Sequence, residues 1–186
     1  MTNEQSAKLR QYTVDMQQLL TDDNVQLFRD HDVTFCTLGT TRANAGSASN
    51  WRKVDVGMVR DSALASKQAE IKQFSLLTSS GANANVWAND WKIFHPLLYM
   101  KSKGEIENEV MSMGFARTSI FRPGLLQRGK FARSEEKMFS SFLRGTPVQD
   151  VAKAMIYDAE STVIDAETAE PAVFYEVNDI QAVAKL

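Results

Sequence analysis

Tyr99 and Lys103 lie four residues apart in the stretch HPLLYMKSKGEIENEV, which spans residues 95–110. At 3.6 residues per turn, both would fall on the apolar face of a helix, together with Ile106 and Val110. A tyrosine that exchanges a proton near neutral pH needs a nearby cation, because free tyrosine has a pKa of about 10. The spacing therefore permits a tyrosine that acts as general acid toward a carbonyl, or as general base in the reverse direction.

The same spacing also has a structural interpretation. The stem of Lys103 would cover apolar surface near the start of the helix, while its ammonium group reaches solvent past Tyr99. An isolated Tyr-x-x-x-Lys pair does not distinguish the two interpretations. Evidence for chemistry must therefore come from other segments of the chain.

Composition narrows the class of protein. The 186 residues are 44% hydrophobic, which is enough for one domain with a core over residues 1–186. A net charge of −2 gives no electrostatic reason to expect nucleic acid as a partner. The N-terminus lacks an apolar signal region, and no stretch is long and apolar enough for a transmembrane segment. A soluble cytoplasmic protein is therefore expected.

Metal-binding residues are sparse. His31 and His95 are far apart, and Cys36 is the single cysteine, so no metal site is predicted and no internal disulfide can form. Cys36 lies in the apolar run VTFCTL and is interpreted as a buried small hydrophobic residue rather than a nucleophile. The basic run RGKFAR, at 128–133, is interpreted as a solvated loop.

Runs of β-forming residues alternate with helical segments, which indicates an α/β fold. Thr146 is expected to cap the last long helix, with Pro147 at its first position. Right-handed crossovers would make the sheet parallel, so a ligand is expected beyond the carboxyl ends of the strands. The predicted strands are 12–16, 33–38, 73–78, 117–121 and 172–177, and the predicted helices are 24–31, 52–68, 96–113, 134–144 and 147–159.

Four segments together carry a family resemblance. FCTLGTTRANAG, FSLLTSSGA, YMKSKGEIE and SIFRPGLL resemble, in order and spacing, the atypical short-chain dehydrogenase/reductase family, in the branch of the Tat-interactive oxidoreductase and its fungal mitochondrial-surface relatives. The resemblance implies a Rossmann-like parallel sheet with flanking helices, NAD or NADP as cofactor, and hydride transfer between the cofactor and a carbonyl or alcohol substrate. It also implies, as an alternative location, peripheral attachment to an organelle surface.

The resemblance assigns roles to three catalytic residues. Tyr99 would be the proton donor, Lys103 would support its phenolate and hydrogen-bond the nicotinamide ribose, and Ser79 would orient the substrate carbonyl. Tyr99 and Lys103 are thereby also cofactor contacts. For Ser79 a simpler interpretation stays open, because a cluster of serines after a strand can merely begin a turn.

The resemblance also assigns cofactor contacts to two loops. Leu38, Gly39 and Thr40 would line the adenine and ribose side of the cofactor, where glycine permits close backbone approach. Pro123 and Gly124 match a turn that passes close to the nicotinamide in the family, although Pro-Gly is also an ordinary turn sequence.

The sequence departs from the family in its phosphate-binding part. The family opens with a strand and a G-x-x-G-x-x-G turn whose amides hold the pyrophosphate, and this sequence contains no such motif. Residues 12–16 correspond to the family's third strand, so its first two strands are expected to be absent and cofactor binding to be weak. Two hypotheses follow: an oxidoreductase impaired in cofactor binding, or a non-catalytic remnant that binds a protein partner.

Overall fold

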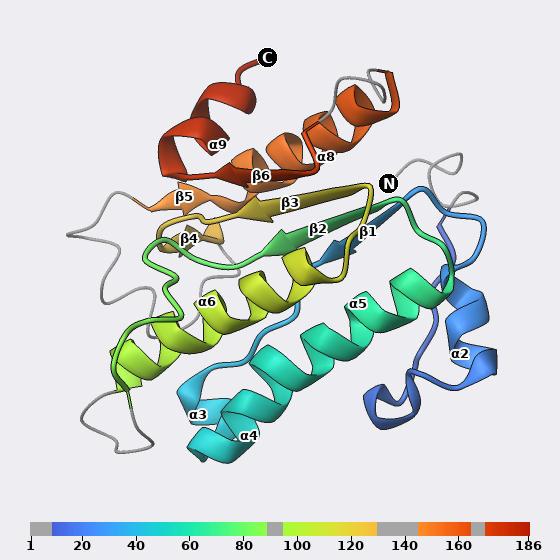
Figure 1. Cartoon of the computed structure of the whole chain (residues 1–186). Helices are drawn as coiled ribbons and strands as arrows, with labels where there is room; N and C mark the ends of the chain where they lie inside the picture. Colours follow the sequence, from blue (N-terminus) through green and yellow to red (C-terminus); the bar gives the residue numbers. More distant parts are fainter. Residues whose placement is uncertain (1–8, 89–94, 130–144, 165–169) are drawn as a thin grey trace.

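A parallel sheet of four strands forms the centre of the computed structural model, which describes residues 9–88, 95–129, 145–164 and 170–186 (Figure 1). The strands lie in the order β1-β2-β3-β6, and each neighbouring pair is parallel. Their bounds are β1 Val33–Cys36, β2 Gln73–Leu77, β3 Arg117–Phe121 and β6 Ala172–Tyr175. The predicted α/β class and four of the five predicted strands are therefore confirmed; β3 has the predicted bounds, and the other three end one or two residues earlier than predicted.

Helices cover both faces of the sheet (Figure 1). On one face, Phe74, Leu76 and Ile120 pack against α5 (Val59–Gln68) and α6 (His95–Ser112). On the other face, Phe121 packs against α8 (Val148–Ile164) and α9 (Val177–Val183). The alternation of side chains along β2 and β3 supplies both cores, because successive residues of a strand point to opposite faces.

The helix predicted at 52–68 is part of a longer helical run. It begins with α4 (Ala48–Arg52), where the Ser47 side chain accepts a hydrogen bond from the Asn50 amide, passes through a π-helical turn at Lys53–Met58, and ends as α5. The helix predicted at 96–113 is found as α6, one residue earlier at each end. The segment predicted as a helix at 134–144 lies outside the described residues.

The predicted strand at 12–16 is wrong. Residues 12–15 have no regular structure, and Asp15 caps a short 3₁₀ helix, Met16–Gln18. Val14 and Met16 instead pack against a cluster of Leu19, Val25, Ala65, Ala69 and Ile71 near the end of α5. A strand needs a neighbouring edge with which to exchange hydrogen bonds, and this segment buries its apolar residues against helices instead.

Other predicted boundaries need correction. The helix predicted at 24–31 is replaced by α2 (Asp22–Val25) and a 3₁₀ turn, Gln26–Phe28. Thr146 and Pro147 do not begin the last long helix, because they form β5, which pairs with β4 (Leu126–Gln127). Two short helices, α3 (Arg42–Ala45) and α9, were not predicted.

Candidate functional site

Tyr99 and Lys103 lie in the first turns of α6, beside the carboxyl ends of β1 and β2. The Lys103 ammonium is 5.8 Å from the centroid of the Tyr99 ring, which also packs edge-on against Trp51 at 5.5 Å between centroids. Tyr99 is half-buried, whereas Lys103 is only 5% exposed. Lys103 therefore does not reach solvent past Tyr99, which rules out the snorkelling interpretation of the pair.

The partner of Lys103 is a residue that the sequence analysis missed. Lys103 Nζ lies 2.9 Å from Oδ1 of Asp55, which the π-helical turn places in the interior at 1% exposure. The other oxygen of Asp55 accepts a hydrogen bond from the backbone amide of Thr40 at 2.9 Å. A sign was present in the sequence, since Asp55 is the one charged residue on a helix face otherwise made of Val59, Ser62, Ala63 and Ser66.

The end of β1 closes over this ion pair. A Cβ atom on Gly39 would stand 3.4 Å from Asp55 Oδ1 and 3.7 Å from Lys103 Nζ, so the backbone passes close to both charges. Leu38 is partly buried and packs on the core beneath. The loop of the three predicted cofactor residues after β1, Leu38, Gly39 and Thr40, thus lies beside Lys103.

Gly104 holds the loop after β2 against α6. A Cβ atom on Gly104 would lie 2.1 Å from the backbone nitrogen of Ala84, a distance that no side chain tolerates. The Asn83 amide also donates to the Met100 carbonyl at 2.9 Å, and Gly81 adopts a positive φ of 81° that favours glycine. The loop that begins at Ser79 is therefore fixed against the helix that carries Tyr99 and Lys103.

Ser79 and the Pro123–Gly124 turn are connected at the same edge of the sheet. The amide of Ser80 donates to the Pro123 carbonyl at 2.8 Å, and the Gly124 amide donates to the Thr146 hydroxyl at 3.2 Å. The Ser79 hydroxyl oxygen is shielded from solvent and has no hydrogen-bond partner among the described residues. The hydroxyls of Ser75 and Ser102 are in the same state, so this observation leaves Ser79 available to a ligand without singling it out.

A second ion pair fixes the Pro123–Gly124 turn from the α6 side. Glu107, one turn after Lys103, receives two hydrogen bonds from Arg122, at 3.0 and 2.6 Å, and one from the Thr78 hydroxyl at 2.6 Å. The hydrogen bonds with Glu107 and the contact with Glu176 raise the pKa of Arg122 above its ordinary value, although burial opposes them. Arg122 therefore anchors the turn through charge.

The residues present fit the nicotinamide and ribose end of a dinucleotide. Lysine has three N–H donors, and Asp55 is the single ion-pair partner of Lys103 among the described residues. An uncommitted hydroxyl on Ser79 and a close backbone approach at Gly39 complete a lining suited to a ribose and a carbonyl. For the pyrophosphate end, the given sequence contains no G-x-x-G-x-x-G turn.

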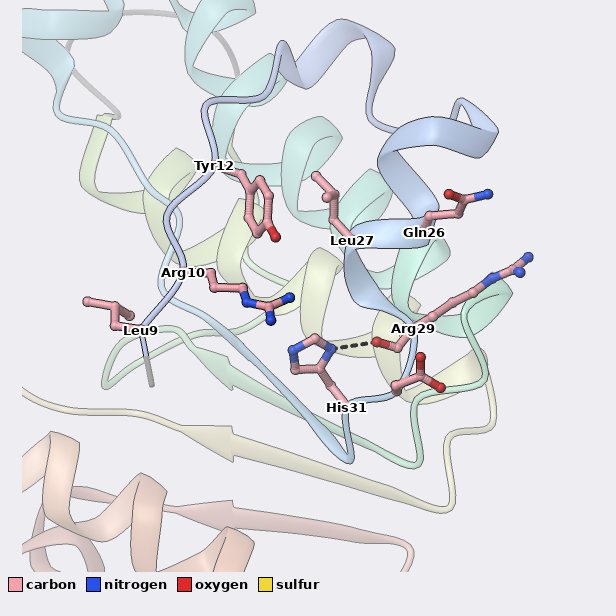
Figure 2. A pocket seen from close by; sticks show the side chains of 8 residues that line it. Leu9, Arg10, Tyr12, Gln26, Leu27, Arg29 and His31 are labelled. Carbon is pink, nitrogen blue, oxygen red and sulfur yellow. Dashed lines mark hydrogen bonds between the residues drawn. The ribbon is translucent and has the colours of Figure 1, made fainter. Parts of the chain in front are cut away.

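A separate pocket of about 670 Å³ opens near the amino end of β1, on the opposite edge of the sheet. Figure 2 shows side chains of the N-terminal segment facing those that precede β1, with His31 Nδ1 2.7 Å from the Arg29 carbonyl oxygen. Its lining residues are Leu9, Arg10, Tyr12, Gln26, Leu27, Arg29, Asp30 and His31. Within the described ranges, no group of three or more histidine, cysteine or acidic residues could hold a metal ion.

Comparisons of sequence with known proteins identify relatives. A family model described as NAD(P)H-binding matches residues 2–161. Protein FMP52, mitochondrial, from Candida albicans is 38% identical over 127 residues, which are 66% of this chain and 52% of that protein. FMP52-1 from Scheffersomyces stipitis is 33% identical over 172 residues, 84% of this chain and 71% of its own length. Protein HTATIP2 from Rattus norvegicus is 40% identical over 118 residues, 63% of this chain and 44% of its own length.

Solved structures give the same fold. MoeE5 in complex with UDP-glucose and NAD has a TM-score of 0.63 at 16% identity, covering 95% of this chain and 68% of MoeE5. An oxidoreductase of the short-chain dehydrogenase/reductase family from Burkholderia thailandensis has a TM-score of 0.61 at 16% identity, covering 89% of this chain and 70% of that one. These likenesses confirm the predicted Rossmann-like fold.

The names of the fungal relatives correct the expected cellular location. The fungal relatives are named mitochondrial, which contradicts the cytoplasmic location expected from the lack of a targeting signal. No helix in the described part of the chain is long and apolar enough to cross a membrane. The chain spans about half the length of the first of the curated relatives that it matches.

The family model confirms the expected cofactor class, NAD or NADP. The chain belongs to the NAD(P)H-binding family, as an atypical short-chain dehydrogenase/reductase of the branch that contains HTATIP2.

Proposed function

We propose that this chain carries the catalytic side of an NAD(P)-dependent oxidoreductase that interconverts a carbonyl and an alcohol. The observation that carries the proposal is the buried Lys103 ammonium, held by Asp55 one helical turn from Tyr99, where strand ends and α6 meet. A tyrosine with a cation one helical turn away is the arrangement by which a phenol can act as general acid toward a carbonyl.

The proposed roles divide among three side chains. Tyr99 gives its proton to the carbonyl oxygen, and Lys103 supports the negative charge that this leaves on the phenol. Ser79 donates a hydrogen bond to the same carbonyl oxygen, and it breaks no existing bond to do so. The nicotinamide ring, when bound, supplies the hydride.

Cofactor contacts are proposed on both sides of this centre. Leu38, Gly39 and Thr40 would line the adenine and ribose side of the cofactor, while Pro123 and Gly124 would lie beside the nicotinamide. Because the phosphate-binding turn is missing from this sequence, we propose that the chain binds NADPH and NADH weakly. Titration calorimetry with each cofactor measures this directly, and a micromolar dissociation constant, about −8 kcal/mol, would contradict weak binding.

Turnover at millimolar NADPH tests the catalytic proposal. The chain is assayed against a panel of aldehydes and ketones, alone and as Tyr99→Phe, which keeps the ring that packs on Trp51 but removes the hydroxyl. We expect NADPH-dependent reduction that falls at least about 100-fold in the variant, as general acid catalysis contributes that much. Equal rates for the two proteins would refute the role of Tyr99.

A second candidate function is binding of a protein partner without catalysis. It is favoured by the edge of the described sheet, where β1 lacks an outer neighbour and Phe35 is 46% exposed. Exposed sheet edges bind extended segments of other chains. Phe35→Ser would weaken capture of such a partner and leave turnover unchanged, whereas loss of turnover without loss of capture would count against this function.

We propose the mitochondrion as the cellular location, because the fungal relatives carry that word in their names. Fractionation of cells that express the tagged chain tests this proposal. Enrichment with a mitochondrial marker is expected, and recovery in the cytosolic fraction would contradict it.

A further inference from the structure

The pocket near the amino end of β1 lies at the opposite ends of the strands from the candidate catalytic residues. One wall is the N-terminal segment with Leu9, Arg10 and Tyr12, and the other is formed by residues 26–31, which precede β1. Its volume of about 670 Å³ is within the range of about 300–1,000 Å³ that is usual for sites of small organic ligands. Ligands of the proposed reaction belong at the carboxyl ends of the strands, so that reaction leaves this pocket without a use.

The charges of the lining favour an anion. Four arginines elsewhere each form an ion pair with a carboxylate: Arg52, Arg60, Arg117 and Arg122. Arg10 and Arg29 form none with any residue in the described part of the chain. Figure 2 shows the Arg10 guanidinium extending into the space between the two walls, toward His31, whereas that of Arg29 extends away from it. Asp30 is the one acidic residue among the described lining residues, so the two arginines leave a net positive charge.

His31 adds a polar group whose hydrogen-bonding state is set by its neighbour. Its Nδ1 lies 2.7 Å from the Arg29 carbonyl oxygen, and because a carbonyl oxygen only accepts, Nδ1 carries the hydrogen. Nε2 remains for a ligand, and Figure 2 shows it on the side of the N-terminal segment. A protonated imidazole donates from this nitrogen to an anion, so His31 and Arg10 can hold the same oxyanion.

Apolar surface beside these polar groups indicates that the ligand also has an apolar part. Leu9 and Tyr12 are 52% and 59% exposed, so more than half of each side chain is available for contact. Leu27 contributes apolar surface from the opposite wall. Apolar walls with a few convergent polar groups are the usual composition of a small-molecule site.

We propose that this pocket binds a small organic anion. Its phosphate or carboxylate group contacts Arg10 and His31, and its apolar or aromatic part packs on Leu9, Tyr12 and Leu27. The inference does not depend on the proposed function, because none of the described lining residues belongs to the candidate catalytic site.

Binding of naphthyl phosphate, naphthoate and naphthol to the untagged chain tests the proposal, because the three compounds share one aromatic body and differ in charge. The chain has two histidines, so the imidazole NMR signals of His31 are assigned by their loss in His31→Gln. We expect these signals to shift saturably with the anions, and the tighter of the two identifies the preferred acidic group. Neutral naphthol should bind at least about tenfold more weakly, since hydrogen bonds to charged groups contribute that much.

Variants locate the bound anion. Arg10→Gln should raise its dissociation constant about tenfold. Lys72→Gln is the matched control, because Lys72 is exposed directly before β2, at the same ends of the strands, but does not line the pocket. Its effect should stay within about twofold, because salt screens distant exposed charges. Asp30→Asn removes the opposing charge and keeps a residue type that tolerates the positive φ of 61°, so binding should tighten about twofold.

Several results would overturn the proposal. His31 signals that do not shift at millimolar anion would show that the pocket is not a site for this class of ligand. Equal affinity for naphthol would mean apolar contact alone, and equal weakening by Lys72→Gln and Arg10→Gln would mean diffuse attraction. Tyr99→Phe should leave the affinity unchanged, and weaker binding in that variant would assign the anion to the candidate catalytic site instead. Circular dichroism establishes that each variant is folded.

Discussion

The buried pair Asp55–Lys103 and the exposed pair Arg60–Glu109 join the same two helical segments, yet their surroundings differ. Arg60 and Glu109 have side-chain exposures of 42% and 32%, so water screens both charges. Asp55 and Lys103 have 1% and 6%, and each has lost nearly all of its hydration. The comparison shows that two ion pairs between the same helical segments differ in their contribution to stability. Loss of the exposed pair costs little free energy, whereas removal of one partner of the buried pair leaves an uncompensated charge in the interior.

A third pair shows what a purely structural buried charge looks like. At the start of β3, Arg117 lies 2.5 Å from Asp158, which also accepts hydrogen bonds from Tyr175 and Gln73 at 2.7 Å each. Several partners surround that carboxylate, and it anchors α8 to the sheet. Lys103, by contrast, has Asp55 as its one ion-pair partner among the described residues, and the proposed function uses its remaining N–H donors.

The largest expected effect is from breaking the buried pair. Lys103→Met leaves Asp55 charged and buried without its cation, so we expect a loss of about 3–5 kcal/mol in the free energy of unfolding. Urea denaturation measures it, with Lys101→Met on the same helix as the control, for which little change is expected. The double variant Asp55→Asn/Lys103→Met should regain part of the loss. A loss below about 1 kcal/mol for Lys103→Met would show that the pair is hydrated in solution.

The next effect concerns the loop that Gly104 holds against α6. Gly104→Ala forces a Cβ into the backbone of Asn83 and Ala84, which must move away, and we expect a loss of about 1–3 kcal/mol. Hydrogen exchange of the Asn83 amide, which donates to Met100, should become faster. Gly57→Ala is the control, because its Cβ would meet its nearest atom at an ordinary 3.9 Å. Equal stability of the two variants would contradict the tight contact.

Local patterns of sequence predicted much of the fold. The segments around β1, β2 and β3 are short apolar runs bounded by turn residues, and α6 has helical periodicity, so each could be recognised without its neighbours. Residues 12–16 show the limit of this reasoning. Their composition suits a strand, but a strand forms only beside another strand with which it can pair. Apolar residues of this segment are buried against the end of α5 instead.

The candidate site was predictable in part, for a related reason. Tyr99, Lys103, Ser79 and the glycines stand in short motifs, so a family resemblance could find them. Asp55 stands alone in its segment, and its use depends on a π-helical turn and on contacts with distant residues. Thr146 and Pro147 were assigned to a helix start from local preference, whereas pairing with β4 decides their structure.

A smaller effect is expected from alkaline pH, and it concerns the buried Cys36 and the half-buried Tyr175 rather than the ion pairs. Burial raises the pKa of the Cys36 thiol, and burial together with the hydrogen bond to Asp158 raises the pKa of the Tyr175 phenol. In both, the folded state binds the proton more tightly than the unfolded state. Stability is therefore complete below the ordinary pKa values and declines as pH rises above about 9 to 10. Urea denaturation at pH 8 and 10.5 should show this decline, and Tyr175→Phe with Cys36→Ala should reduce it.

The smallest effect on stability is expected at the exposed pair Arg60–Glu109. Glu109→Gln removes a carboxylate that water already solvates, so the free energy of unfolding should fall by no more than about 1 kcal/mol. Half a molar salt should remove most of that difference, because the Debye length then drops to a few ångströms. The loss in Lys103→Met should persist in the same salt, since ions do not reach a buried charge. Denaturation of both variants at low and high salt measures the contrast. A salt-independent loss above about 2 kcal/mol in Glu109→Gln would mean that the outer pair is as desolvated as the inner one, and that burial does not distinguish the two pairs.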